Sequence, residues 1–149
     1  HQLLLVIVLF ASAFSYRINF FNQCERSIEV VARPMDGPNS RHAVPVCSLD
    51  ADSMCNGEFK VALFIYETAN GTTAEFDSTR GHLNDQIMYG INITAGFDVA
   101  MQIDVDADSP VVGKSVTCAN ATCFDGMAPF LHDVIPYTKD TAFDLTFCP

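Results

Sequence analysis

The chain has 149 residues, which is enough for one domain with a hydrophobic core. Its formal net charge is −10, and residues 1–13 contain no Asp, Glu, Lys or Arg, so all of this charge lies on the rest of the chain. An acidic surface repels nucleic acid and anionic lipid, and we therefore exclude both as partners.

The N-terminal segment predicts the compartment. An apolar run over residues 3–10 is followed by Ala-Ser-Ala at 11–13, which is typical of a secretory signal peptide and its cleavage site. We expect residues 1–13 to be removed, or the cut to follow Ser15, which leaves one secreted domain over 14–149. The alternative is a buried N-terminal strand or helix. The run is far shorter than the ~20 residues of a membrane-spanning helix, and no second run is long enough, so we expect the mature protein to be soluble. We also expect it to be a monomer.

The rest of the chain alternates apolar and polar residues with a period of two, which is typical of half-buried strands. The predicted strands are, in chain order, RINFFN (17–22) and SIEVVA (27–32) as a pair, FKVALFIY (59–66), IMYGINIT (87–94), DVAMQIDV (98–105) and AFDLTF (142–147). The segment 59–66 is apolar on both faces and is predicted to lie deeper. Gly, Pro, Asn and Asp recur at short intervals between these runs, so the sequence indicates an all-β antiparallel sandwich or barrel.

The six cysteines are Cys24, Cys47, Cys55, Cys118, Cys123 and Cys148. An even number in a secreted chain indicates disulfides, although six cysteines allow 15 pairings. A zinc site at Cys118 and Cys123 is the alternative, which the absence of a CxxC motif or a partnered His pair disfavours.

Three N-x-T triplets predict glycosylation at Asn70, Asn92 and Asn120. Asn92 falls on the face of its strand opposite to the predicted core, so a glycan there is sterically possible.

No cofactor and no metal site is predicted. Asp104, Asp106 and Asp108 form D-x-D-x-D, but Ser109 and Ser115 stand where a calcium-binding loop needs Gly and Glu, so we interpret the segment as a solvated turn. His132 beside Asp133 could be an acid/base pair, but no nucleophile motif accompanies it.

Three blocks of the sequence resemble the thaumatin-like (osmotin) family. These are INFFNQC (18–24), TTAEF (72–76) followed by YGINITAGFDVAM (89–101), and the closing FDLTFCP (143–149). They occur in the family's order and reach both ends of the predicted mature chain. The resemblance implies a disulfide-linked antiparallel β-sandwich.

The resemblance also implies that the first and last cysteines, Cys24 and Cys148, are bonded to each other. The remaining pairs, Cys47 with Cys55 and Cys118 with Cys123, are inferred from proximity in the sequence. The family's cysteine-rich helical insert would follow Met101, where only 16 residues precede Cys118, so a reduced form without the insert is expected.

Many members of the family bind or hydrolyse β-1,3-glucan in a cleft lined by an Arg, a Glu and three Asp. Glu75 matches the Glu, and Asp133 is a possible match for one Asp, while Gly90 and Ala95 replace the other two. Asp98 could substitute for a lost carboxylate, and no Arg of this chain matches. Our candidate ligand-binding residues are therefore Glu75, Asp98 and Asp133, which would form a shallow anionic patch if they converge.

The function expected from these features is a secreted thaumatin-like binding protein that recognises a glycan, such as a β-glucan, or an extracellular protein, in defence or host interaction. The alternatives are a β-1,3-glucan hydrolase with antifungal action and an inhibitor of secreted hydrolases. Hydrolysis needs a pair of carboxylates, and the losses at Gly90 and Ala95 favour a protein that is not an enzyme.

Overall fold

The computed structural model describes residues 15–35, 42–78, 86–123, 130–138 and 140–149, so the predicted signal peptide lies outside the described residues. The described chain is built from β-strands. They are β1 (Tyr16–Asn22), β2 (Ile28–Pro34), β3 (Val44–Leu49), β4 (Met54–Phe59), β5 (Leu63–Tyr66), β6 (Thr73–Asp77), β7 (Gln86–Asn92), β8 (Met101–Val105), β9 (Val116–Cys118), β10 (Phe130–Pro136) and β11 (Ala142–Phe147). Within the described ranges no helix is long and apolar enough to cross a membrane.

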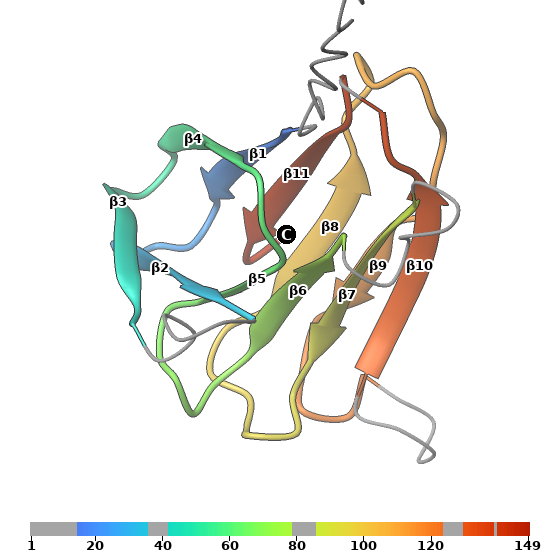
Figure 1. Cartoon of the computed structure of the whole chain (residues 1–149). Coiled ribbons are helices and arrows are strands. Elements are labelled where there is room, and N and C mark those ends of the chain that lie inside the picture. The colour runs from blue at the N-terminus through green and yellow to red at the C-terminus, as the bar shows by residue number, and fades with distance from the viewer. Residues whose placement is uncertain (1–14, 36–41, 79–85, 124–129, 139) are drawn as a thin grey trace, which may run out of the picture.

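The strands form two sheets that pack face to face, which confirms the predicted β-sandwich (Figure 1). One sheet has the order β4-β1-β11-β8-β9 and the other has the order β10-β7-β6-β5-β2-β3. Neighbouring strands are antiparallel, except that β1 and β11 run parallel. The N-terminal and C-terminal strands therefore lie side by side in the middle of the five-stranded sheet.

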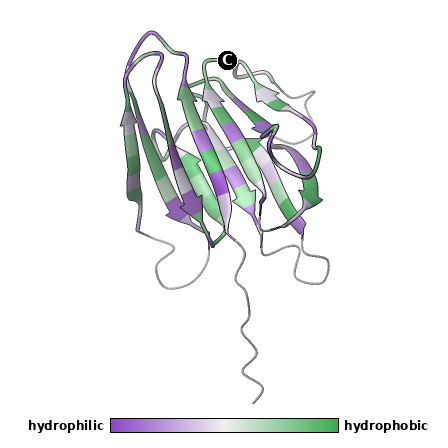
Figure 2. Ribbon diagram, turned by 90° about the horizontal axis from the view of Figure 1, so that it is seen from above, coloured by the Kyte–Doolittle hydropathy of each residue, from purple (hydrophilic) through white to green (hydrophobic). Residues whose placement is uncertain are grey.

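The core follows the alternation seen in the sequence, which is visible as alternating colours along the strands in Figure 2. On β11, Phe143, Leu145 and Phe147 are fully buried, and the buried Met101 and Ile103 of β8 lie on the same face of the sheet. On β7, Ile87, Tyr89 and Ile91 are likewise fully buried. The alternate apolar residues of β7, β8 and β11 therefore face the core, as a period of two predicts.

Two expectations about the strands were wrong. The segments 17–22 and 27–32 are not paired, because β1 and β2 belong to different sheets. The segment 59–66 is not one deep strand: Phe59 ends β4, the chain turns at 60–62, and Leu63 begins β5 in the opposite sheet. Val61 in this turn is 46% exposed. A run that is apolar on both faces thus crosses from one sheet to the other.

The disulfides agree with the predicted pairing. Cys24 is bonded to Cys148, Cys47 to Cys55 and Cys118 to Cys123, with Cα atoms 5.1, 6.8 and 5.1 Å apart respectively. All six cysteines are used, and the zinc alternative for Cys118 and Cys123 was wrong.

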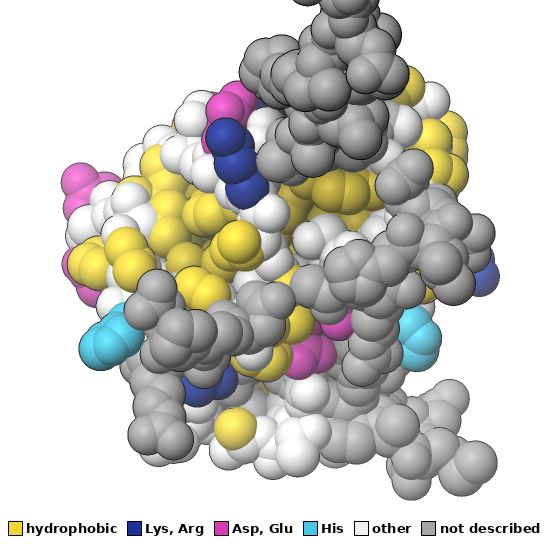
Figure 3. Space-filling view, viewed as in Figure 1, with side chains coloured by type: hydrophobic (Ala, Val, Ile, Leu, Met, Phe, Trp, Pro, Cys, Tyr) yellow, Lys and Arg dark blue, Asp and Glu magenta, His cyan; other side chains and the backbone are white. Residues whose placement is uncertain are grey.

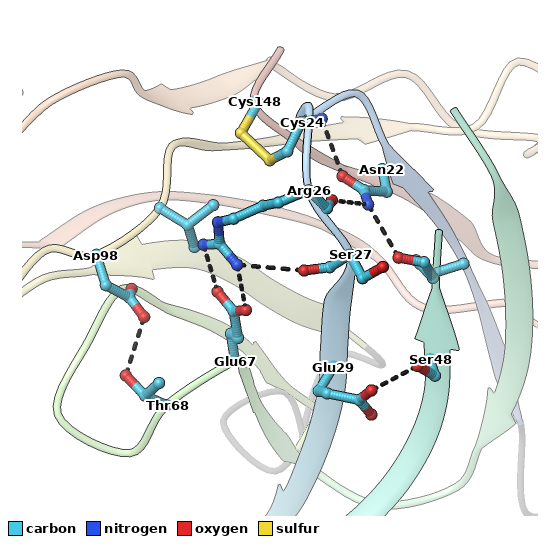
Figure 4. Close-up of polar contacts among 12 residues, drawn as sticks. Asn22, Cys24, Arg26, Ser27, Glu29, Ser48, Glu67, Thr68, Asp98 and Cys148 are labelled. Carbon is cyan, nitrogen blue, oxygen red and sulfur yellow. Dashed lines mark hydrogen bonds and ion pairs between the residues drawn. A yellow bond between two sulfur atoms is a disulfide. The ribbon is translucent and has the colours of Figure 1, made fainter. Parts of the chain in front are cut away.

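Polar contacts surround the Cys24–Cys148 disulfide at one end of the sandwich (Figure 4). The buried side chain of Asn22 accepts a hydrogen bond from the backbone N–H of Cys24 at 2.9 Å and donates to the carbonyl of Leu49 at 3.0 Å. Arg26 donates two hydrogen bonds to the carboxylate of Glu67. These contacts join the loop after β1 to β3 and to the end of β5.

Candidate functional site

Glu75 lies on the outer face of the six-stranded sheet. The strand pairing sets Arg33 of β2 opposite Phe64 of β5, Phe64 opposite Glu75 of β6, and Glu75 opposite Gly90 of β7. Residues that are directly opposite in an antiparallel pair share a face, so these four positions form a row across the sheet. The Arg33 guanidinium lies 4.9 Å from the centre of the Phe64 ring, a cation–π contact.

A groove runs along this row and the neighbouring one. Its volume is about 240 Å³, and Tyr66, Thr73 and Asn92 of the next row line it together with Arg33, Phe64 and Glu75. It is smaller than the roughly 300–1,000 Å³ of a small-molecule pocket, so it fits part of a ligand rather than enclosing one. It combines a cation, a carboxylate, two aromatic rings and neutral polar groups.

Arg33 is not among the site residues predicted from the sequence. Nothing in the local pattern distinguishes it from any charged residue on a solvent-facing strand, and only the strand order brings β2 within two strands of Glu75. Its Nε atom is buried and has no hydrogen-bond acceptor among the described residues. A buried donor of this kind is uncommon in folded proteins.

Asp98 does not line the groove. One carboxylate oxygen accepts a hydrogen bond from the backbone N–H of Thr72 at 2.7 Å, and the other accepts from the Thr68 hydroxyl at 2.9 Å (Figure 4). A Cβ atom on Gly71 would lie 2.2 Å from this carboxyl group, so the close approach requires glycine. Asp98 therefore closes the turn between β5 and β6.

Asp133 lies on the opposite face of the sheet from Glu75. It is paired with the fully buried Tyr89, whereas Glu75 is paired with Gly90. Its carboxylate accepts hydrogen bonds from the Tyr89 hydroxyl at 3.0 Å and from the backbone N–H of Lys114 at 2.9 Å. Burial opposes ionisation, but these bonds and that from the Val134 N–H outweigh it and lower the pKa of Asp133.

The three predicted site residues therefore do not converge on one anionic patch. Glu75 lies in the groove, while the carboxylates of Asp98 and Asp133 hold a turn and a loop in place. The position of Asp133 could have been predicted from the alternation of β10. Asp133 is two residues from Ile135, so both side chains lie on the same face of the strand, and Ile135 is buried.

The three predicted glycosylation positions differ in their surroundings. Asn70 and Asn120 are exposed, in the turn before β6 and in the loop after β9, and Asn92 is half-buried at the end of β7. At Asn120 the side-chain oxygen accepts hydrogen bonds from both the N–H and the hydroxyl of Thr122.

A carboxylate pair that the sequence analysis did not propose lies on the outer face of the five-stranded sheet. The Asn19 amide donates to Asp106 at 2.8 Å and to Asp144 at 2.9 Å. Burial raises the pKa of Asp144, and its contact with Asp106 and the charges of Asp106 and Asp104 add to this. The hydrogen bond from the backbone N–H of Asp108 lowers the pKa of Asp106. Contacts with Asp144, Arg17 and Asn19 lower it further. The arrangement favours one shared proton.

This pair predicts a pH-dependent effect of Asp144→Asn. At a pH below the usual Asp pKa of about 3.9, Asp144 is protonated in both the folded and the unfolded state. The stability that the protonated side chain contributes to the wild-type protein is then fully present. That contribution is lost as the pH rises through the raised pKa of the folded state. Since Asn resembles the protonated acid, the variant should be more stable than wild type at pH 7, with the difference vanishing below about pH 3.9.

Urea unfolding at several pH values measures this effect. The exposed Asp52→Asn change is the control for removing one negative charge from an acidic domain. A stability difference for Asp144→Asn that does not change with pH would contradict the shared proton.

Among the described residues, no group of three or more His, Cys, Asp or Glu side chains could hold a metal ion. Asp106 and Asp108 lie in the turn after β8, where the Asp106 side chain accepts a hydrogen bond from the Asp108 N–H at 2.8 Å. This agrees with the interpretation of the D-x-D-x-D segment as a turn.

No family model and no curated protein matches the sequence. Solved structures match the fold. A thaumatin-like xylanase inhibitor, TLXI, is 13% identical with a TM-score of 0.66, over 89% of this chain and 99% of its own. The protein elicitor MoHrip2 from Magnaporthe oryzae is 16% identical with a TM-score of 0.61, over 90% of this chain and 99% of its own. The chain therefore has the thaumatin-like fold, in a form in which the described residues are all sandwich and loop.

Proposed function

We propose that the protein is an extracellular, non-catalytic binding protein whose groove on the six-stranded sheet takes a neutral glycan. The extracellular location is supported by the signal-peptide pattern and by three disulfides, which persist in oxidising compartments. The solved neighbours have the same fold, and they are a xylanase inhibitor and a protein elicitor.

The composition of the groove is the observation that carries the proposal. Arg33 and Glu75 contribute one charge of each sign, so the groove has no net charge to select an ionic ligand. Phe64 offers ring surface, to which the mostly buried Tyr66 (8% exposed) adds little, and Thr73 and Asn92 offer neutral polar groups. A sugar ring has apolar faces bordered by hydroxyl groups, so it can pack against an aromatic ring while its hydroxyls form hydrogen bonds. Hydrogen bonds from these hydroxyls to the charged Arg33 and Glu75 would be stronger than those to the neutral groups.

The absence of hydrolysis is proposed from the carboxylates. Glycoside hydrolysis uses two carboxyl groups, about 5–5.5 Å apart with retention or about 6.5–9.5 Å apart with inversion. Gly90 stands directly opposite Glu75, where the resembled family has an Asp. Asp98 and Asp133 are engaged elsewhere, so neither is placed to act with Glu75.

Binding and turnover of laminarin oligosaccharides by the mature, disulfide-bonded protein test the proposal. We expect a Kd in the micromolar range or weaker, because an open groove leaves each hydrogen bond worth about 0.5–1.5 kcal/mol. Glu75→Gln and Arg33→Met should each weaken binding about three- to tenfold without changing the melting temperature much, and no reducing sugar should be released.

Glu29→Gln is the matched control, since Glu29 lies on β2 and bonds to Ser48, away from the groove. Binding that survives both groove variants would exclude the groove as the site. Release of reducing sugar that falls in Glu75→Gln would instead establish a hydrolase.

The second candidate function is inhibition of a secreted hydrolase through a protein contact. Val44 of β3, Met54 of β4 and Val61 are 54%, 55% and 46% exposed. Hydrophobic side chains also gather on the face of the molecule that Figure 3 shows. The Cys47–Cys55 disulfide joins β3, which carries Val44, to β4, which carries Met54. If this function is correct, Met54→Glu should abolish inhibition of a susceptible xylanase or glucanase, and Glu75→Gln should not.

A further inference from the structure

We propose that an N-glycan attached to Asn92 lies in the groove of its own domain, so that glycosylation at this position decides whether the groove is open to an external ligand. The inference rests on the proposed function in one respect: it takes the groove to be one that fits a sugar.

Both ends of the Asn92 triplet line the groove. Asn92 is half-buried at the end of β7, and Thr94, the third residue of the triplet, lines the groove with it. The Asn92 side-chain oxygen accepts a hydrogen bond from the Thr94 N–H at 2.7 Å. This bond uses the oxygen of the Asn92 amide. The amide nitrogen, to which a glycan would be attached, takes no part in it.

The path for the first sugars follows the sheet. Asn92 is opposite Thr73, and Thr73 is opposite Tyr66, so the three residues form one row across β7, β6 and β5. Adjacent strands are about 4.8 Å apart, which places Tyr66 about 10 Å from Asn92. The neighbouring row, which contains Glu75 and Phe64, forms the rest of the floor of the groove. A glycan that extends from β7 across the strands therefore meets Thr73 and Glu75 on β6, and then Phe64 beside the mostly buried Tyr66 on β5.

The covalent link makes even weak contacts effective. A group that is tethered close to its site has an effective concentration in the millimolar range. A sugar that binds the groove with a Kd of about 0.1 mM would then occupy it in about nine molecules of ten, and an external ligand would bind about tenfold more weakly. The glycosylated and unglycosylated proteins are thus expected to differ in ligand affinity without any change of fold.

The chain contains its own control for this effect. Asn120 carries the same kind of triplet, but it is exposed and is not among the residues that line the groove. A glycan at Asn120 should therefore extend into solvent, while a glycan at Asn92 should be covered by the protein.

The experiment compares the release of the two glycans by an endoglycosidase, followed by peptide mass mapping of protein secreted from a glycosylating host. In the folded protein, release at Asn92 should be at least about tenfold slower than at Asn120, and the two rates should become equal after reduction and denaturation. Phe64→Ala, which removes part of the groove floor, should speed release at Asn92 and leave Asn120 unchanged.

An unoccupied Asn92, equal rates in the folded protein, or a slow rate at Asn92 that Phe64→Ala does not change would each overturn the inference. A separate measurement tests the proposed function: protein of the unchanged sequence, produced without glycans and with its three disulfides formed, should bind laminarin oligosaccharides about tenfold more tightly than the glycosylated protein. A protected Asn92 glycan combined with no laminarin binding by the unglycosylated protein would refute the proposed external ligand and leave the covered glycan established.

Discussion

Replacing Cys24 and Cys148 together by serine is expected to lower the free energy of unfolding by up to about 4–5 kcal/mol. The disulfide closes a loop of 124 residues, and in the chain-entropy model the stabilisation grows with the logarithm of loop length. A loss of this size is a large part of the 5–15 kcal/mol that stabilises a typical domain. The double serine variant also avoids leaving a reactive thiol.

The Cys118–Cys123 disulfide serves as the matched control in the same measurement, urea unfolding monitored by circular dichroism. Cys118 and Cys123 are only 5 residues apart, so their double serine variant should lose about 2 kcal/mol in the same model. Equal losses for the two variants would contradict the loop-length argument. The C-terminal strand keeps further contacts without the bond, since the Cys148 N–H donates to the Ala100 carbonyl at 2.8 Å and the Gln23 N–H donates to that of Phe147.

Phe143→Ala should cost about 3–5 kcal/mol, because it opens a cavity between the two sheets. Phe143 is fully buried on β11, and its ring centre lies 5.0 Å from that of Tyr89 and 5.1 Å from that of Phe76, both in the opposite sheet. A third ring, that of Tyr16 on β1, lies 6.3 Å away. The substitution therefore removes the aromatic contacts that join β11 to β6 and β7.

The same unfolding experiment on Phe143→Leu separates the cavity from the loss of aromatic contacts. Leu refills most of the volume, and we expect a loss of about 1–2 kcal/mol. Thr146→Ala, on the outer face of the same strand, should lie within about 0.5 kcal/mol of wild type. A Phe143→Ala variant within 1 kcal/mol of wild type would show that the central rings contribute little to stability.

Local features of the sequence predicted some of the strands of this protein but not β3, β6, β9 and β10, which lie outside the predicted runs. The period-two alternation predicted which side chains of β7, β8 and β11 face the core, because successive side chains of a strand point to opposite faces whatever the strand pairs with. It would also have placed Asp133 on the core side with Ile135. The pairing of Cys24 with Cys148 came from the resemblance of the sequence to a known family, since spacing alone leaves 15 pairings open.

Only the tertiary structure decided how these elements meet. The parallel pairing of β1 with β11 joins segments separated by about the length of the domain, and no local pattern specifies such a partner. The groove depends on the same information, because Arg33 lies near Glu75 only through the order β2-β5-β6. Alternation is a property of one strand, whereas strand order and register follow from how all the apolar faces are buried together. A site built from four strands is therefore visible only in the folded chain.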